Sequence, residues 1–443
     1  MPRRLRHSIA ALSAAVLGGL LLLADQRADR SNCNVLAAGQ TLRWYRGNIH
    51  THSLWSDGDD YPEMIALWYK EHGYDFLSFS DHNTLQEGQR WIDALKAKKG
   101  ADALARLKTR FPEGWIEERM TEAGRMEVRL KTHEELAAEL SSPGRFLLLK
   151  GEEISDHFRD CPVHLNATNL RELVPPMGGD SVYDVMQRNA DALVAQRERT
   201  GQPMIVHLNH PNFHFGITAE ELARVRGENF FEVYNGHTQV NNDGDEMHAS
   251  AERIWDIILT QRITSLRLPL MFGLATDDSH DYHDMPSRGN EPGRGWISVL
   301  ARELSPHEII RALDRGDFYA STGVRLSRIA TSEKSVDVAV EAEPGIDYTI
   351  DFIGTRSGYD PASEPVKDRR GIPRRITRRY SNDIGRVLKT QTGARATYRF
   401  DDDDLYVRAR VTSTRRHPNP SAPGEYERAW CQPALGPAAR SAQ

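Results

Sequence analysis

Histidines and carboxylates follow a series of short β-rich runs in this chain, and this pattern constrains the fold more than any other feature. The runs predict strands at residues 43–49, 76–79, 146–150, 163–165, 204–208, 230–234 and 271–275. The polar residues that end or follow them are His50-Thr51-His52 with Asp57, Ser80-Asp81-His82-Asn83, Gly151-Glu152-Glu153, His164, Asn209-His210-Pro211-Asn212 and Asp278-Ser279-His280. Because residues i and i+2 of a strand point to the same side, His50 and His52 can approach one ion together.

Amphipathic helical stretches alternate with these runs and predict strand and crossover-helix units around a parallel sheet or barrel. The helices are expected at residues 62–72, 181–199, 219–226, 251–262 and 306–315. Parallel barrels place catalytic groups at the carboxyl ends of several strands. A lone histidine is more often a structural residue, but the ordered set of clusters favours one functional site.

Two further segments differ in composition from this α/β part. Residues 83–144 are rich in Lys, Glu and Arg and predict a helical insertion, which is either a lid over one end of the barrel or a solvated helical hairpin. Residues 324–435 alternate like strands and predict a small, β-sandwich-like C-terminal module. Its run Asp401 to Asp404 is expected to be a solvated turn rather than a cation site.

The N-terminus carries an export pattern. Arg3, Arg4 and Arg6 precede an apolar run over residues 9–24, which is short for a membrane-spanning helix. Residues 1–38 are therefore expected to be a signal peptide or, alternatively, an uncleaved anchor. The expected location is periplasmic or extracellular.

Composition excludes several classes of protein. A net charge of −6 with interspersed acidic and basic residues argues against nucleic-acid binding, so the expected partner is a small molecule. The three cysteines are too few and too scattered for a disulfide framework or a thiolate zinc site. A bridge between Cys33 and Cys431 in an oxidising compartment stays open, as does the alternative of three isolated thiols.

The clusters resemble the motifs of the PHP superfamily, named for polymerase and histidinol phosphatase. The resemblance covers roughly residues 44–323, within an expected barrel domain at residues 41–323, and it implies a distorted (β/α)7 barrel that holds up to three metals. It is strongest to secreted members that include a carbaryl-hydrolase-like branch. The segments that carry this finer resemblance are Phe231-Glu232-Val233-Tyr234-Asn235-Gly236-His237, Ala275 to His280, Phe318 to Gly323 and Ala429-Trp430.

The resemblance also implies a set of metal ligands. The first metal would be held by His50, His52, Glu153 and Asp278, the second by Glu153, His164 and His210, and the third by Asp57, His82 and His280. Family spacing prefers Glu153 to Glu152, Asp278 to Asp277 and His210 to His207. Nitrogen and carboxylate ligands without thiolate suit Mn, Fe or Zn, and they do not select among the three.

Such a centre predicts a hydrolase that uses a metal-bridging hydroxide. Three divalent ions, three carboxylates and one hydroxide sum to a charge of about +2, which favours an anionic substrate such as a small phosphate ester. The alternatives are hydrolysis of a carboxylic ester, amide or carbamate on the same centre, and a non-catalytic metal-binding scaffold.

Residues outside the ligand set are expected to decide the substrate. Arg288 and Arg294 are candidate phosphate clamps, whereas Trp55, Phe213, Phe215 and Tyr234 are candidates for an apolar pocket. His237 is the first candidate for the acid that protonates the leaving group, ahead of His157, His214 and His283.

Overall fold

The computed structural model describes residues 42–441, which lie in one compact unit. The expected signal segment and Cys33 lie outside the described residues. Within residues 42–441, no helix combines the length and apolarity needed to cross a membrane. Cys431 is fully buried there, and burial raises the pKa of its thiol to about 12.

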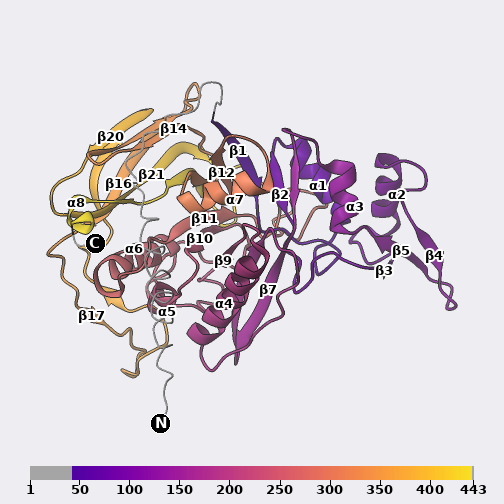
Figure 1. Cartoon of the computed structure of the whole chain (residues 1–443), viewed down its shortest axis with the longest axis horizontal. Coiled ribbons are helices and arrows are strands. Elements are labelled where there is room, and N and C mark those ends of the chain that lie inside the picture. Colours follow the sequence, from indigo (N-terminus) through magenta and orange to yellow (C-terminus); the bar gives the residue numbers. More distant parts are fainter. Residues whose placement is uncertain (1–41, 442–443) are drawn as a thin grey trace, which may run out of the picture. The chain divides into compact units, whose positions relative to one another are not determined.

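The predicted α/β part contains two sheets (Figure 1). In one, β1 (Arg43–Asn48), β2 (Phe76–Ser78) and β6 (Leu147–Leu149) run parallel. The order in the other is β11 (Phe272–Thr276), β10 (Phe230–Asn235), β9 (Ile205–Leu208), β8 (Cys161–Thr168) and β7 (Gly151–Phe158). Its strands β9 to β11 are parallel, β8 pairs antiparallel with β9, and β7 at the edge pairs antiparallel with β8.

Every predicted strand of this part is present, and the α/β prediction is confirmed at that level. A closed seven-stranded barrel is not found among the described residues. The two sheets are linked by the isolated parallel bridges Thr51 to Ser279 and His82 to Glu153, which lie beyond the carboxyl ends of β1, β2 and β11. The additional strand β7 contains Glu153, which was expected to follow a strand rather than lie within one.

The predicted helices are also present, with boundaries within two residues. They are α1 (Pro62–Glu71), α4 (Val182–Thr200), α5 (Ala219–Arg224), α6 (Ala251–Gln261) and α7 (Pro306–Arg315). Local chemistry explains the starts, because serine or threonine side chains at Ser181, Thr218, Ser250 and Ser305 accept hydrogen bonds from backbone N–H groups of the first turn. The end of α6 continues into a π-helical turn, Arg262–Leu266.

The insertion, residues 83–144, is not purely helical, so that prediction is wrong in part. It contains an antiparallel sheet of β3 (Arg90–Asp93), β5 (Met126–Leu130) and β4 (Glu118–Met120), together with helices α2 (Ala101–Arg110) and α3 (His133–Leu140). Charged residues occupy the exposed faces of strands and of helices. The strand pattern of the buried Ile92, Val128 and Leu130 was therefore not recognised in the sequence. These side chains share a hydrophobic core with Tyr61 and Tyr69.

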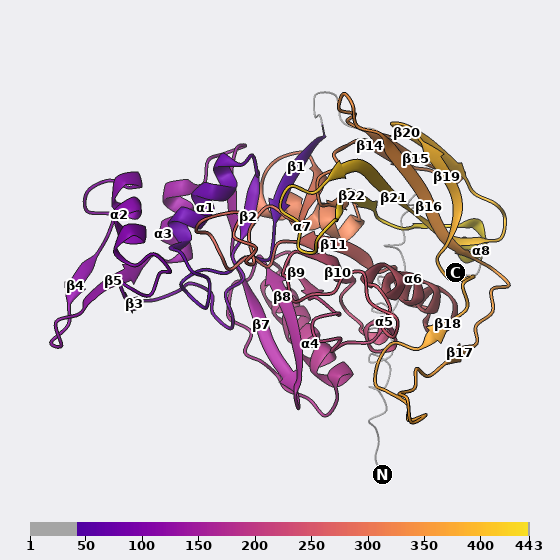
Figure 2. The same ribbon diagram turned by 180° about the vertical axis from the view of Figure 1, so that it is seen from behind.

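The C-terminal segment is rich in strands, as expected, but it extends the sheet that contains β1. That sheet runs β19 (Arg386–Thr392), β16 (Tyr348–Arg356), β21 (Asp404–Arg416), β22 (Tyr426–Cys431), β13 (Phe318–Ser321), β12 (Trp296–Ala301), then β1, β2 and β6. The remaining elements are β14 (Leu326–Thr331), β15 (Ser335–Val340), β17 (Ser363–Glu364), β18 (Arg379–Tyr380), β20 (Arg395–Arg399), β23 (Ala434–Leu435) and α8 (Pro437–Arg440). Figure 2 shows the C-terminal strands on one side of the α/β part and the insertion on the other.

Candidate metal centre

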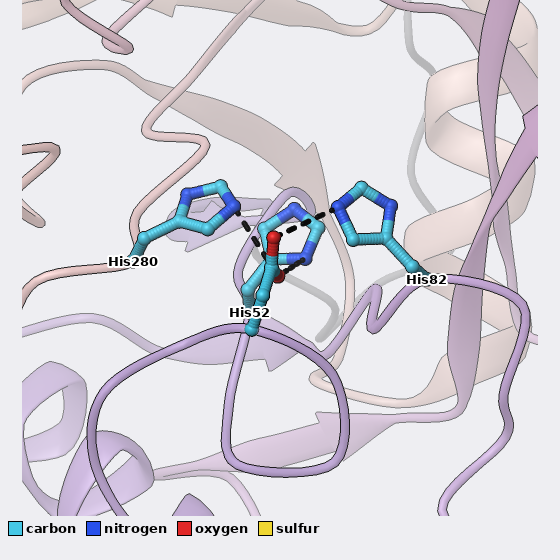
Figure 3. Close-up of side chains that lie close together, drawn as sticks. His52, His82 and His280 are labelled. Atoms are coloured by element: carbon cyan, nitrogen blue, oxygen red, sulfur yellow. Dashed lines mark ion pairs between the residues drawn. The ribbon is translucent and has the colours of Figure 1, made fainter. Parts of the chain in front are cut away.

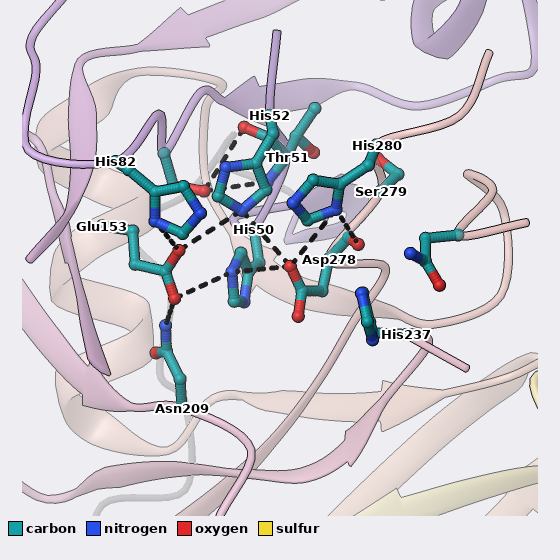
Figure 4. Close-up of polar contacts among 12 residues, drawn as sticks. His50, Thr51, His52, His82, Glu153, Asn209, His237, Asp278, Ser279 and His280 are labelled. Carbon is teal, nitrogen blue, oxygen red and sulfur yellow. Dashed lines mark hydrogen bonds and ion pairs between the residues drawn. The ribbon is translucent and has the colours of Figure 1, made fainter. Parts of the chain in front are cut away.

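The nine residues that the sequence singles out as ligands come together beyond the carboxyl ends of β1, β2, β9 and β11, with Glu153 within β7 and His164 within β8. We call them the His–carboxylate cluster. Figure 4 shows six of them converging, with Asn209 and His237 beside them. The members of the cluster are His50, His52, Asp57, His82, Glu153, His164, His210, Asp278 and His280.

The innermost part of the cluster is formed by His50, His52 and Asp278. The Nε2 atoms of His50 and His52 lie 3.1 and 3.2 Å from Asp278 Oδ1. Both imidazoles are fully buried, and neither Nε2 atom has a hydrogen-bond partner. Because buried polar atoms are normally paired, two such nitrogens directed at one carboxylate oxygen fit a site for a metal ion.

Glu153 connects this part to the rest of the cluster. Its Oε1 atom lies 3.1 Å from His164 Nδ1 and 3.5 Å from His210 Nε2, whereas its Oε2 atom lies 2.8 Å from His82 Nδ1 and 3.4 Å from His52 Nε2. Asn209 donates a hydrogen bond of 2.7 Å to Oε1. A carboxylate with histidines on both oxygens has the arrangement needed to bridge two ions.

A third group, His52, Asp57, His82 and His280, lies at the open side of the cluster and is called the Asp57 group. Figure 3 shows its three imidazoles, His52, His82 and His280. Asp57 Oδ2 lies 3.4 Å from His82 Nε2, and Oδ1 lies 3.5 Å from His280 Nε2 and 3.6 Å from His52 Nδ1. The Asp57 side chain is 55% exposed, so this group is the part of the cluster most accessible to solvent.

The electrostatics of the cluster hold its carboxylates in the charged form. Burial alone would raise the pKa of Glu153, but the neighbouring His82, His164 and His50 lower it well below its ordinary value. The pKa of Asp278 is lowered in the same way, against burial, by His50, His52 and His280. Burial, together with the neighbouring His280, lowers the pKa of His52 to about 4, so this ligand candidate is a neutral imidazole at neutral pH.

Glu232 is the main site residue that sequence reasoning missed. Its Oε1 atom lies 2.6 Å from His50 Nδ1 and accepts a 2.7 Å hydrogen bond from Thr276 Oγ1, and its Oε2 atom accepts one from the backbone N–H of His210. It also contacts His207, which is fully buried beside it rather than in the cluster. A carboxylate on the far nitrogen of a ligating histidine fixes the tautomer and orientation of the ring. The available signal was an acidic residue inside the apolar run Phe230–Asn235.

In each of the two adjacent acidic pairs, the residue that the family spacing did not prefer lies outside the cluster. Asp277 lies outside the cluster, where its carboxylate accepts hydrogen bonds from Tyr69 Oη and from the backbone N–H groups of residues 293–295. Glu152 accepts one from Val174 N–H and faces away from the cluster members. Asp278 adopts a φ of 50°, a strained conformation of the kind that concentrates at functional sites.

His237 lies at the edge of the cluster. Its ring is 5.5 Å from that of His280 and 5.9 Å from that of Phe213. Its Nδ1 atom accepts a hydrogen bond from Gln239 N–H, so the neutral ring carries its proton on Nε2. Burial lowers the pKa of His237 to about 4, against the attraction of Asp278. His237 is thus a neutral N–H donor at neutral pH, and its role in protonating the leaving group stays a prediction.

The prediction that Arg294 contacts substrate requires correction. Its side chain is completely buried, and its guanidinium donates hydrogen bonds to the carbonyl oxygen of Gly236 and to both the carbonyl and side-chain oxygens of Asn419. With no exposed surface, it joins two loops and cannot reach a substrate. Arg288 is exposed to solvent.

The aromatic candidates behave differently from one another. Trp55 and Tyr234 are buried, and their polar atoms already have hydrogen-bond partners. Trp55 Nε1 donates to Lys131 O, and Tyr234 Oη donates to Ser421 and Glu425. Phe215 stacks on His248, with 3.6 Å between the ring centres. Phe213 is the one of the four that contacts the cluster, because its ring lies 5.0 Å from that of His210.

Comparison with known proteins gives distant structural likenesses. No protein-family model and no curated protein matches the chain. A two-domain protein from Bacteroides vulgatus ATCC 8482, containing a predicted PHP-like metal-dependent phosphoesterase, is 16% identical, with a TM-score of 0.38 over 91% of this chain and 99% of that one. PsfC from Pseudomonas syringae PB-5123 is 14% identical, with a TM-score of 0.31 over 61% and 88%.

A candidate metal-dependent phosphoesterase from Bifidobacterium adolescentis ATCC 15703 is 16% identical, with a TM-score of 0.27 over 53% of this chain and 87% of that one. None of the three is described as a carbaryl hydrolase, and that finer resemblance stays a prediction.

Proposed function

We propose that this protein is a metal-dependent hydrolase of the PHP superfamily, and that it acts as a phosphoesterase on a small phosphate ester. The observation that carries the proposal is the pair of buried, unpartnered Nε2 atoms of His50 and His52, both directed at Asp278. Buried polar atoms are normally hydrogen-bonded, so two such nitrogens beside one carboxylate oxygen favour an ion held by all three side chains.

The proposed ion ligands follow the three groups of the cluster. His50, His52, Glu153 and Asp278 would hold one ion, Glu153 with His164 and His210 a second, and Asp57 with His82 and His280 a third. The ions, Mn, Zn or Fe, would supply Lewis acidity and an activated water at neutral pH. Glu232 keeps His50 Nε2 directed at the cluster, and Asn209 and Asn235 keep the carboxylates of Glu153 and Asp278 in place through single hydrogen bonds.

The choice of a phosphate ester rests on charge. Three divalent ions exceed the charge of the three carboxylates, so the open side near Asp57 would attract an anion. His237 would donate its Nε2–H to an oxygen of the substrate or leaving group, as a neutral hydrogen-bond donor rather than as a charged acid.

Hydrolysis of a carboxylic ester, amide or carbamate is the second candidate, and one observation favours it. Phe213 places an aromatic ring beside His210, whereas Arg294, expected to bind phosphate oxygens, is buried elsewhere. An apolar surface at the cluster without a neighbouring guanidinium suits a neutral, aromatic substrate.

The test compares an aryl phosphate, an aryl acetate and an aryl N-methylcarbamate, using protein stripped of metal and then loaded with Mn or Zn. We expect no activity in the stripped protein and recovery on loading, with the phosphate preferred. The Asp278→Asn variant, which keeps the shape of the side chain, serves as the inactive control. Preference for the carbonyl substrates would replace the phosphoesterase proposal with the second candidate. A loaded protein that is inert to all three would favour a metal-binding scaffold.

A further inference from the structure

The insertion contacts both loops that carry the exposed ligand candidates of the Asp57 group. Lys98 Nζ lies 3.5 Å from Asp59 Oδ2 and 3.0 Å from Asp281 Oδ1. Asp59 follows Asp57 by two residues, and Asp281 directly follows His280. One ammonium group of the insertion therefore joins the loop of Asp57 to the loop of His280.

Two more cations of the insertion contact the same loops. Lys96 Nζ donates hydrogen bonds of 3.2 and 3.4 Å to the carbonyl oxygens of Ser56 and Leu54, so it holds the backbone directly before Asp57. Arg106 Nη2, on α2, donates to Asp60 Oδ2 at 2.9 Å and to His283 Nδ1 at 3.0 Å, again joining the two loops.

The loops need such cations because their own charges repel. Asp57, Asp59, Asp60 and Asp281 place four carboxylates in two segments that pair through the bonds Asp59 N–H to His280 O and Tyr282 N–H to Asp59 Oδ1. Like charges held this close in a partly buried site raise the free energy of the paired arrangement. Lys98 and Arg106 reduce that repulsion from outside the cluster.

The contacts also distinguish a fixed element from a mobile lid. The backbone N–H of Lys98 donates a 3.1 Å hydrogen bond to the carbonyl oxygen of Asp59, and the buried side chains of the insertion share a core with Tyr61. A lid that opens in each catalytic cycle would have to break both. The insertion is therefore attached to the Asp57 loop by its main chain as well as by its cations.

We propose that the insertion is a positioning element for the Asp57 group: Lys96, Lys98 and Arg106 set the separation of Asp57 and His280 and thereby the affinity of this group for its ion. This inference rests on the proposed function, because it requires the group to bind a metal. The three cations are positioning residues, since they act through Asp57 and His280 without touching the ion.

Mn²⁺ binding tests the proposal, with free Mn²⁺ measured by electron paramagnetic resonance during a titration of the metal-free protein. Simple electrostatics predicts that Lys98→Ala tightens binding, because a positive charge near a cation site is removed. Positioning predicts the opposite, a weakening of about tenfold, comparable with the loss of other groups that orient ligands. The sign of the change therefore separates the two explanations.

Three further variants make the titration specific. Asp57→Asn identifies the class of binding site that belongs to the Asp57 group, and Lys98→Ala should weaken that class alone. Lys98→Arg should restore much of the affinity, because it keeps the charge between Asp59 and Asp281. Lys108→Ala is the matched control, since Lys108 lies in the same insertion but pairs with Glu118 inside it, and its titration should match the wild type.

Unchanged or tighter binding in Lys98→Ala, or equal weakening of every class of site, would overturn the inference and leave the proposed function standing. A wild-type protein that binds no Mn²⁺ or Zn²⁺ would instead overturn the proposed function, and the inference with it. Lys98 is 44% exposed, so its replacement is not expected to prevent folding, and a thermal unfolding curve checks this.

Discussion

Glu232 Oε1 lies 2.6 Å from His50 Nδ1, on the side of the imidazole opposite the unpartnered Nε2 atom. This contact determines which nitrogen of His50 faces the cluster. We therefore expect Glu232 to contribute to the proposed metal binding through His50, without touching the ion.

Glu232→Gln tests this role. The amide keeps the size of the side chain but removes the negative charge that stabilises the His50 N–H, so we expect metal affinity or kcat/KM to fall by about 10-fold to 100-fold. A Mn²⁺ titration and steady-state kinetics measure the two effects. Glu228→Gln is a suitable comparison, because Glu228 is buried beside Arg197 and makes no contact with the cluster. Equal losses in both variants would indicate general destabilisation.

Removing the metal should lower the stability of the whole protein. An ion that binds only the folded state stabilises it by about 2.7 kcal/mol when its concentration is 100 times its Kd. We therefore expect a chelator to lower Tm, and added Mn²⁺ to restore it. In His50→Ala the chelator should have a smaller effect on Tm than in the wild type. A Tm that does not respond to chelation would argue against a resident ion.

His237→Ala should slow the reaction by about tenfold, the effect of losing one neutral hydrogen bond in the transition state. His237→Gln should retain more activity, because its amide can still donate. Since the pKa of His237 is lowered to about 4, the pH–rate profile of the wild type should show no limb near pH 6.5 that disappears in these variants. Such a limb would instead support His237 as the acid that protonates the leaving group.

Glu252 gives a pH-dependent contribution to stability away from the cluster. Its carboxylate lies 3.0 Å from Arg408 Nη1 and 3.1 Å from Arg410 Nη1, and so connects α6 with β21. Burial opposes its ionisation, but the two arginines lower its pKa to about 2. A carboxyl whose folded pKa is below its unfolded value stabilises the protein above the unfolded pKa, and this stabilisation is lost as the pH falls from about 4.5 towards 2.

Glu252→Gln should therefore cost about 3 kcal/mol at pH 7, the free energy that corresponds to this change in pKa. Urea unfolding at pH 7 and at pH 3 measures the difference, which should shrink at pH 3 because the carboxyl of the unfolded chain is protonated there, so unfolding takes up a proton. A cost that is the same at both pH values would show that packing rather than charge is responsible.

The sequence predicted the elements of the α/β part because their signals are local. Period-two and period-3.6 patterns, helix caps such as Ser181, and histidines at strand ends are all visible within a few residues. The polar clusters at the strand ends were visible for the same reason, whereas the choice of the nine members, such as Glu153 over Glu152 and Asp278 over Asp277, came from the family resemblance.

Long-range relationships were harder to predict. Nothing local in the sequence indicates that Glu232 on β10 contacts His50, which follows β1 of the other sheet, or that Arg294 donates hydrogen bonds to the loop of Asn419. The insertion was misjudged because exposed strands and exposed helices tolerate the same charged residues. The pairing of β22 with β13 also joins segments about a hundred residues apart.

The place of β1 has a consequence for the order in which the centre forms. β1, which leads into His50 and His52, pairs with β12 over Arg43 to Gly47, and its partners Ile297 to Ala301 are made some 250 residues later in synthesis. Contacts so distant along the chain form late and slow the folding of a domain. The cluster can therefore exist only once most of the chain has been made and has collapsed. Until then its histidines remain separate, so we expect the proposed metal capture to belong to the last stage of folding.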